Sequence, residues 1–99
     1  LSKNEISKSK IPEKQFYQAA GILAAHRCRK VKGLYPSAKF ASDQLGKAFI
    51  NSGLPLSIVA DKNLLKASMS LSSIMNQSCE DFTDYSKAND ILLKYFKPQ

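Results

Sequence analysis

The stretch FYQAAGILAAHRC, residues 16–28, decides the fold of this chain. Its apolar residues recur at steps of three and four, a spacing that places them on one face of a helix. The predicted face consists of Phe16, Ala20, Leu23, Ala24, Cys28 and Val31. A helix with such a face must bury it against other elements, so the rest of the chain is expected to cover it.

Both ends of this first helix are marked in the sequence. Pro12 suits a first turn because its missing N–H costs nothing there, and Glu13 complements the positive end of the helix dipole. Gly33 can adopt the left-handed conformation that ends a helix. Four cations precede it, where they meet the negative end of the dipole: Arg27, Arg29, Lys30 and Lys32.

Three further helices are predicted downstream. Ser37 can cap the second and Asp61 the third, because their side-chain oxygens accept an orphan backbone N–H, and Thr83 or Asp84 can start the last. Gly46 inside the second helix costs about 1 kcal/mol relative to alanine, so we expect it to mark close contact with a neighbouring helix. The apolar faces are Ala38, Ala41, Leu45, Ala48 and Phe49; Leu64, Leu65, Ala67, Leu71, Ile74 and Met75; and Tyr85, Ala88, Ile91, Leu92, Tyr95 and Phe96.

Residues 54–60 are predicted to form a short additional helix. No alternating strand pattern competes with these segments, so the fold class is all-α, a small bundle of four or five helices. The bundle occupies residues 11–99 as a single helical domain. Residues 1–10 have no periodic apolar face, and we expect them to form a flexible N-terminal tail.

Composition argues against a membrane protein and against an enzyme. The chain has 99 residues, of which 43% are hydrophobic, and no run approaches the roughly 18 to 20 apolar residues of a membrane helix. With one histidine and two separated cysteines, the chain has few of the side chains from which catalytic sites are built. His26 and Cys28 point about 200 degrees apart on a helix, so the imidazole cannot readily activate the thiol. We expect no catalytic residues, no metal and no cofactor.

Cys28 and Cys79 are predicted to form one disulfide. They match neither a redox pair nor a zinc-ligand cluster, and an even count in a small chain favours a bond. In the chain-entropy model, a link across about 50 residues stabilises a fold by roughly 4 kcal/mol. The chain starts at Leu1 rather than at methionine, so we also expect an upstream piece to have been removed.

The charge is concentrated in one half of the chain. The net charge is +7, and residues 1–50 carry all of it, because residues 51–99 hold equal numbers of lysines and acids. Such asymmetry indicates an anionic partner, which we expect to be a protein rather than a nucleic acid. The candidate partner-binding residues are Arg27, Arg29, Lys30, Lys32, Tyr35 and Lys39.

Two other interpretations of the same cations stay open. The first is a nucleic-acid-binding module, in which the cations neutralise phosphates and Tyr35 stacks a base of a single strand. The second is a helix cap and solubilising surface with no partner at all.

The stretch from Phe16 to Cys28, followed by Cys79 and a short terminal helix, resembles small exported cyanobacterial proteins of unknown function. Some of these carry a class-II cAMP phosphodiesterase label, but phosphodiesterase metal sites are rich in His and Asp, and this chain has one histidine. The resemblance implies a helical fold, a disulfide and export to a periplasm, a lumen or the exterior. Periplasmic immunity proteins of type VI secretion share this outline and imply a protein-inhibitor role instead.

Overall fold

Residues 11–96, the part of the chain that this computed structural model describes, contain four α-helices and one short 3-10 helix. Their order is α1 (Glu13–Val31), α2 (Ala38–Asn51), η2 (Leu56–Ala60), α3 (Lys62–Ser72) and α4 (Tyr85–Phe96). No strand occurs in this part, in which Met75 and Phe82 form an isolated bridge. The all-α class is therefore confirmed, whereas the predicted flexible tail, residues 1–10, lies outside the described residues.

The helix ends follow the predicted capping residues. The Ser37 hydroxyl accepts a backbone N–H from the first turn of α2 at 3.0 Å, and the Asp61 carboxylate accepts one from α3 at 2.8 Å. Asp84 does the same for α4 at 3.0 Å. Gly33 and Gly53, which follow α1 and α2, have φ angles of 70° and 68°, a left-handed conformation that glycine adopts without strain.

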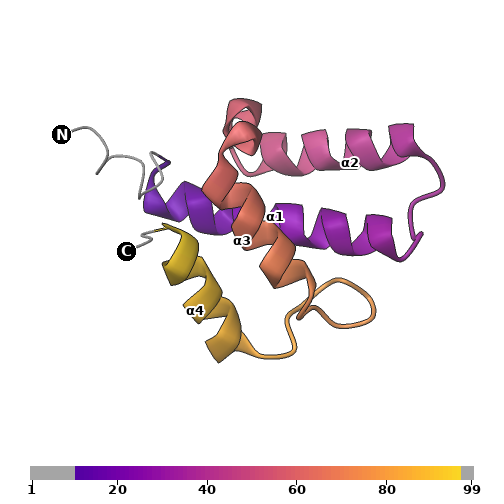
Figure 1. Ribbon diagram of the computed structural model, residues 1–99. Coiled ribbons are helices and arrows are strands. Elements are labelled where there is room, and N and C mark those ends of the chain that lie inside the picture. The colour runs from indigo at the N-terminus through magenta and orange to yellow at the C-terminus, as the bar shows by residue number, and fades with distance from the viewer. Residues whose placement is uncertain (1–10, 97–99) are drawn as a thin grey trace.

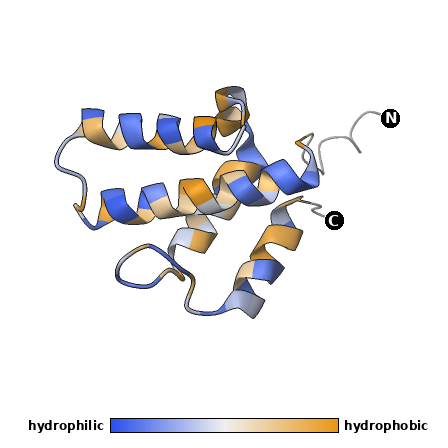
Figure 2. Ribbon diagram, turned by 180° about the vertical axis from the view of Figure 1, so that it is seen from behind, coloured by the Kyte–Doolittle hydropathy of each residue, from blue (hydrophilic) through white to orange (hydrophobic). Residues whose placement is uncertain are grey.

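Helix α1 is the central element, and α2, α3 and α4 all pack against it (Figure 1). Helix α2 lies beside α1 and runs in the opposite direction, while α4 lies on the other side of α1 and packs against α3 (Figure 1). Figure 2 shows hydrophilic residues along much of α2, in agreement with the burial of only Ala41 and Phe49 on that helix. Helix α2 is thus attached to the bundle by a narrow apolar contact.

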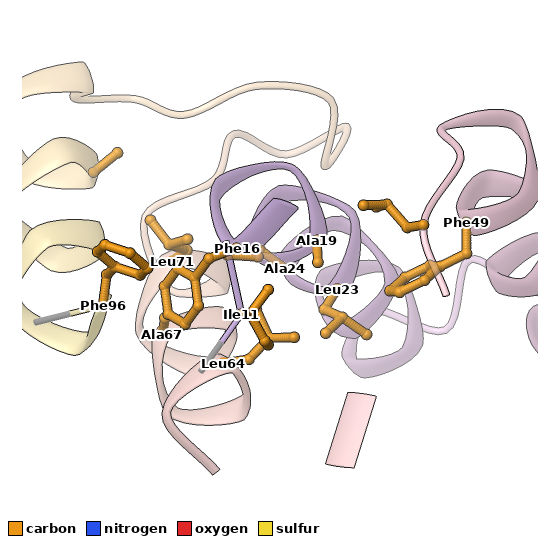
Figure 3. Packing of buried hydrophobic residues seen from close by; sticks show 13 residues of the cluster. Ile11, Phe16, Ala19, Leu23, Ala24, Phe49, Leu64, Ala67, Leu71 and Phe96 are labelled. Carbon is orange, nitrogen blue, oxygen red and sulfur yellow. The ribbon is translucent and has the colours of Figure 1, made fainter. Parts of the chain in front are cut away.

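The core is built around Phe16, which is fully buried on α1. The Phe96 ring of α4 lies 5.2 Å from the Phe16 ring, and Leu64 of α3 packs into the same cluster (Figure 3). Phe49 extends from α2 toward Leu23 at the other end of the cluster (Figure 3). Burial of side chains of this size contributes about 1.5 to 3 kcal/mol each, so the core stabilises all four α-helices together.

Several sequence expectations are wrong. Val31 is 74% exposed, so the buried face of α1 ends at Cys28, because no helix covers the last turn on that side. Leu65 and Tyr85 were expected on buried faces, yet they are 41% and 64% exposed. Gly46 marks no close helix contact, because a Cβ added there would meet no atom within 4 Å.

Helix α3 is shorter than its apolar pattern predicts. Ile74 and Met75 lie beyond its last residue, Ser72. The hydroxyls of Ser72 and Ser73 donate to the carbonyls three residues earlier, at 2.8 Å and 2.7 Å. Serine hydroxyls that bond locally in this way weaken the continuation of a helix, and the two apolar residues instead join the loop that leads to α4.

The predicted disulfide between Cys28 and Cys79 is present, with a Cα–Cα distance of 5.7 Å, and both residues are buried. Cys79 lies in the loop between α3 and α4 rather than at the end of the third helix. Its φ of 60° is left-handed, which is uncommon for a residue with a side chain. The bond therefore joins the last turns of α1 to an irregular segment, which backbone hydrogen bonds also close on itself, from the Asn76 N–H to the Asp81 carbonyl at 2.9 Å and from the Thr83 N–H to the Ile74 carbonyl at 2.8 Å.

Candidate partner-binding surface

A groove lies between the C-terminal half of α1 and α3, and we call it the α1–α3 groove. It consists of two neighbouring hollows of about 420 Å³ and 280 Å³. The hollows share Arg27, Val31 and Met69, so they form one continuous surface. Helix α1 with its C-cap lines this surface over residues 23–32, and α3 with its C-cap lines it over residues 65–73.

The floor of the groove is apolar and partly open to solvent. Leu23 is buried, whereas Leu65 and Met69 are 41% and 50% exposed and Val31 more so. Leu65 and Met69 are four residues apart and therefore lie on one face of α3. Isolated exposed apolar residues are ordinary on a protein surface, but apolar residues gathered along a concave surface indicate a site of interaction.

Two cations, Arg27 and Lys30, line the α1 side of the groove. They are three residues apart on α1, so they share a face, and both are exposed. Neither forms an ion pair within residues 11–96. No Asp or Glu from the described part of the chain lines either hollow. The two charges therefore create a positive potential beside an apolar floor, which no carboxylate of the described residues lines.

Lys32 lines the end of the groove, but its ammonium group is already engaged. Its Nζ donates to the backbone carbonyls of Asn76 and Gln77, both at 3.2 Å. The Asn76 side-chain oxygen in turn accepts the backbone N–H of Glu80 at 3.1 Å. Lys32 thus holds the loop that carries Cys79 against the end of α1, a structural role that the sequence pattern did not indicate.

Tyr35 packs against other rings of the same molecule. Its hydroxyl lies 3.3 Å from His26 Nδ1, and its ring centroid lies 5.4 Å from that of His26 and 6.1 Å from that of Phe40. Burial lowers the pKa of His26 below its ordinary value, and the nearby charges of Lys30 and Arg29 lower it further. This shift favours the neutral form of His26, whose ring lines the wider hollow of the groove.

The remaining candidates lie away from the groove. Arg29 is half-buried and lines neither hollow, since it points about 200 degrees away from Arg27 around the helix. Lys39 is on α2 and pairs with Asp43 at 3.0 Å, an exposed pair of the kind worth about 0 to 1 kcal/mol. Arg29 and Lys30 lie in the last turn of α1, so both also complement its dipole.

The structure brings Arg27, Lys30 and Lys32 of the six predicted residues to one groove. The apolar floor residues of α3, Leu65 and Met69, were missed as candidates for partner binding. Their spacing of four residues placed them correctly on one helix face. No sequence signal indicated that this face borders the basic end of α1, because the two segments are far apart in the chain.

Two further observations concern cofactors and membranes. Within residues 11–96, no three His, Cys, Asp or Glu side chains gather so that they could hold a metal ion. None of the helices in the same residues is long and apolar enough to span a bilayer.

Comparison of the chain with protein-family models, with curated proteins and with solved structures found no match.

Proposed function

We propose that this protein is a non-enzymatic, exported helical domain that binds an anionic protein partner through the α1–α3 groove. One observation carries the proposal: Arg27 and Lys30, which form no ion pair within residues 11–96, lie beside an open apolar floor that no Asp or Glu of those residues lines. Unneutralised charge next to exposed apolar surface is the arrangement that attracts and then retains a partner of opposite charge.

The disulfide supports export. Disulfides persist in oxidising compartments such as a periplasm, an organelle lumen or the extracellular space, and they are rare in the cytosol. The Cys28–Cys79 bond is buried and joins two elements of the core, so its place in the fold is structural. A structural disulfide of this kind fits a domain that works outside the cytosol.

The chemistry of the groove favours a protein partner over a nucleic acid. Sites for single-stranded nucleic acids combine a basic groove with aromatic side chains on which bases stack. Apart from the His26 ring, the apolar lining of the groove is aliphatic, and Tyr35, the candidate for stacking, packs against His26 and Phe40 instead. An inhibitor of the immunity type is one specific form of such a protein-binding role.

The experiment that tests this proposal compares two pairs of charge removals. Fluorescence anisotropy measures binding of a labelled polyglutamate peptide and of a labelled single-stranded DNA oligonucleotide, at several salt concentrations. The test variant is Arg27→Gln with Lys30→Gln. The control is Lys47→Gln with Lys87→Gln, which removes two exposed cations that do not line the groove.

We expect the groove pair to weaken peptide binding by roughly fivefold, since two rim charges contribute about 1 kcal/mol together, while the control pair has little effect. Equal losses from both pairs would mean that the protein attracts anions diffusely, and the groove would not be a site. Two results together would favour the nucleic-acid alternative. The oligonucleotide would bind more tightly than the peptide, and the steep salt dependence of its binding would be reduced by the groove pair but not by the control pair.

A further inference from the structure

We infer that the occupant of the α1–α3 groove is an acidic amphipathic helix of the partner, with its apolar face on Leu65, Met69 and Val31 and its carboxylates along the α1 side only. This inference rests on the proposed function and specifies the kind of partner segment. Three properties of the groove carry it: its length, the spacing of its apolar residues and the one-sided placement of its charge.

The groove has the length of a short helix. Its α1 side covers residues 23–32, which is about 14 Å at a rise of 1.5 Å per residue. Residue numbers increase in the same direction along both sides of the groove. The wider hollow begins at residue 23 on the α1 side and residue 65 on the α3 side, and the narrower hollow ends at residues 32 and 73. A ligand helix of about ten residues can therefore follow the groove over its whole length.

The exposed apolar residues are spaced like the anchors of a helical ligand. Leu65 and Met69 are one turn apart on α3, and Val31 faces them from the last turn of α1. Grooves that bind helices accept side chains at steps of three, four and seven residues, which is the period of such a row. The thioether of Met69 is flexible and adapts to apolar side chains of different shapes.

The charge of the groove is restricted to one side. Arg27 and Lys30 are both on α1. The α3 side carries serines, and the hydroxyls of Ser68 and Ser72 donate to the carbonyls of Leu65 and Met69, both at 2.8 Å. Serine is uncharged and these hydroxyls are satisfied within α3, so the α3 residues that line the groove offer a carboxylate no positive charge. A matching helix therefore has carboxylates on the flank that faces α1 and uncharged residues on the other.

The test uses a synthetic peptide of about 14 residues with blocked ends, slightly longer than the groove so that its frayed ends lie outside. Leucines recur in it at steps of three and four, and glutamates occupy one flank. A second peptide replaces the leucines by serine at the same charge, and a third replaces the glutamates by lysine. Binding is measured by titration calorimetry and by backbone amide chemical shifts.

The protein variants separate the apolar floor from the charged rim. Leu65→Ser with Met69→Ser removes the floor, and Leu93→Ser with Ile50→Ser is the matched control, since these residues are 46% and 71% exposed on α4 and α2. We expect the floor variant to weaken binding of the first peptide by about tenfold or more and the control to leave it unchanged. Chemical shifts should change over residues 23–32 and 65–73.

The outcomes distinguish this inference from the proposed function. If the serine peptide binds as well as the leucine peptide, and binding still depends on Arg27 and Lys30, the helical ligand is refuted and the basic protein-binding surface stands. If neither the floor variant nor the Arg27 and Lys30 variant changes binding, both are refuted. The inference is also overturned if the leucine peptide does not bind. It is overturned likewise if phosphatidylglycerol vesicles bind the protein more tightly than this peptide does and lose affinity when Leu65 and Met69 are replaced.

Discussion

Replacing both Cys28 and Cys79 by alanine removes the one covalent link between α1 and the loop before α4. The link closes a sequence separation of 51 residues. The chain-entropy model assigns about 4 kcal/mol of stability to a loop of this length, because the link restricts the unfolded chain far more than the folded one. Small domains have total stabilities of about 5 to 15 kcal/mol, so this loss is a large part of the whole.

Thermal and urea unfolding of the two proteins, followed by circular dichroism, measure the effect. We expect the melting temperature to fall by about 16 to 32 °C, because 1 kcal/mol corresponds to roughly 4 to 8 °C in a domain of this size. The urea m-value should rise, because the unfolded chain without the link exposes more surface. Reduction of the natural protein by a phosphine should reproduce the variant.

A loss below about 1 kcal/mol would refute the reasoning, which requires that the unlinked chain gain the full entropy of the open loop. A melting temperature that falls in the variant but not on reduction would also contradict it. That result would assign the stabilisation to packing of the two sulfur atoms rather than to the covalent bond.

Three further predictions follow from the same structure. Phe49→Ala should destabilise the protein by about 3 to 5 kcal/mol in urea unfolding, since this fully buried ring attaches α2 to the core. Gly46→Ala should stabilise it by about 0.5 to 1 kcal/mol, because a Cβ there meets nothing within 4 Å, whereas Gly53→Ala should destabilise it, because φ there is 68°. Because the pKa of His26 is lowered in the folded protein, the unfolded chain takes up a proton at a higher pH than the folded protein does. The stability that comes from neutral His26 is therefore complete above about pH 6.5 and is lost at lower pH. His26→Gln should therefore reduce the change in melting temperature between pH 7 and pH 5. If the melting temperature of the variant depends on pH as that of the natural protein does, His26 is not the responsible group.

The sequence by itself determined the features that depend on neighbouring residues. Helix positions followed from apolar spacing, and the caps Ser37 and Asp61 were predicted because a side-chain oxygen reaches a backbone N–H three residues away. The disulfide was predictable because the chain contains only two cysteines. Charge asymmetry indicated an anionic partner and drew attention to the end of the first helix.

Only the tertiary structure decided which of these residues act together. Periodicity shows that residues share a helix face, but it does not show what covers that face. Val31 and Leu65 fit buried stripes, yet they are exposed because no element packs over that end of α1 and α3. Lys32 bonds to carbonyls more than 40 residues away, whereas Arg27 and Lys30 form no ion pair within the described residues. The groove exists because two helices distant in sequence pack side by side, and such long-range packing leaves no periodic signal in either segment.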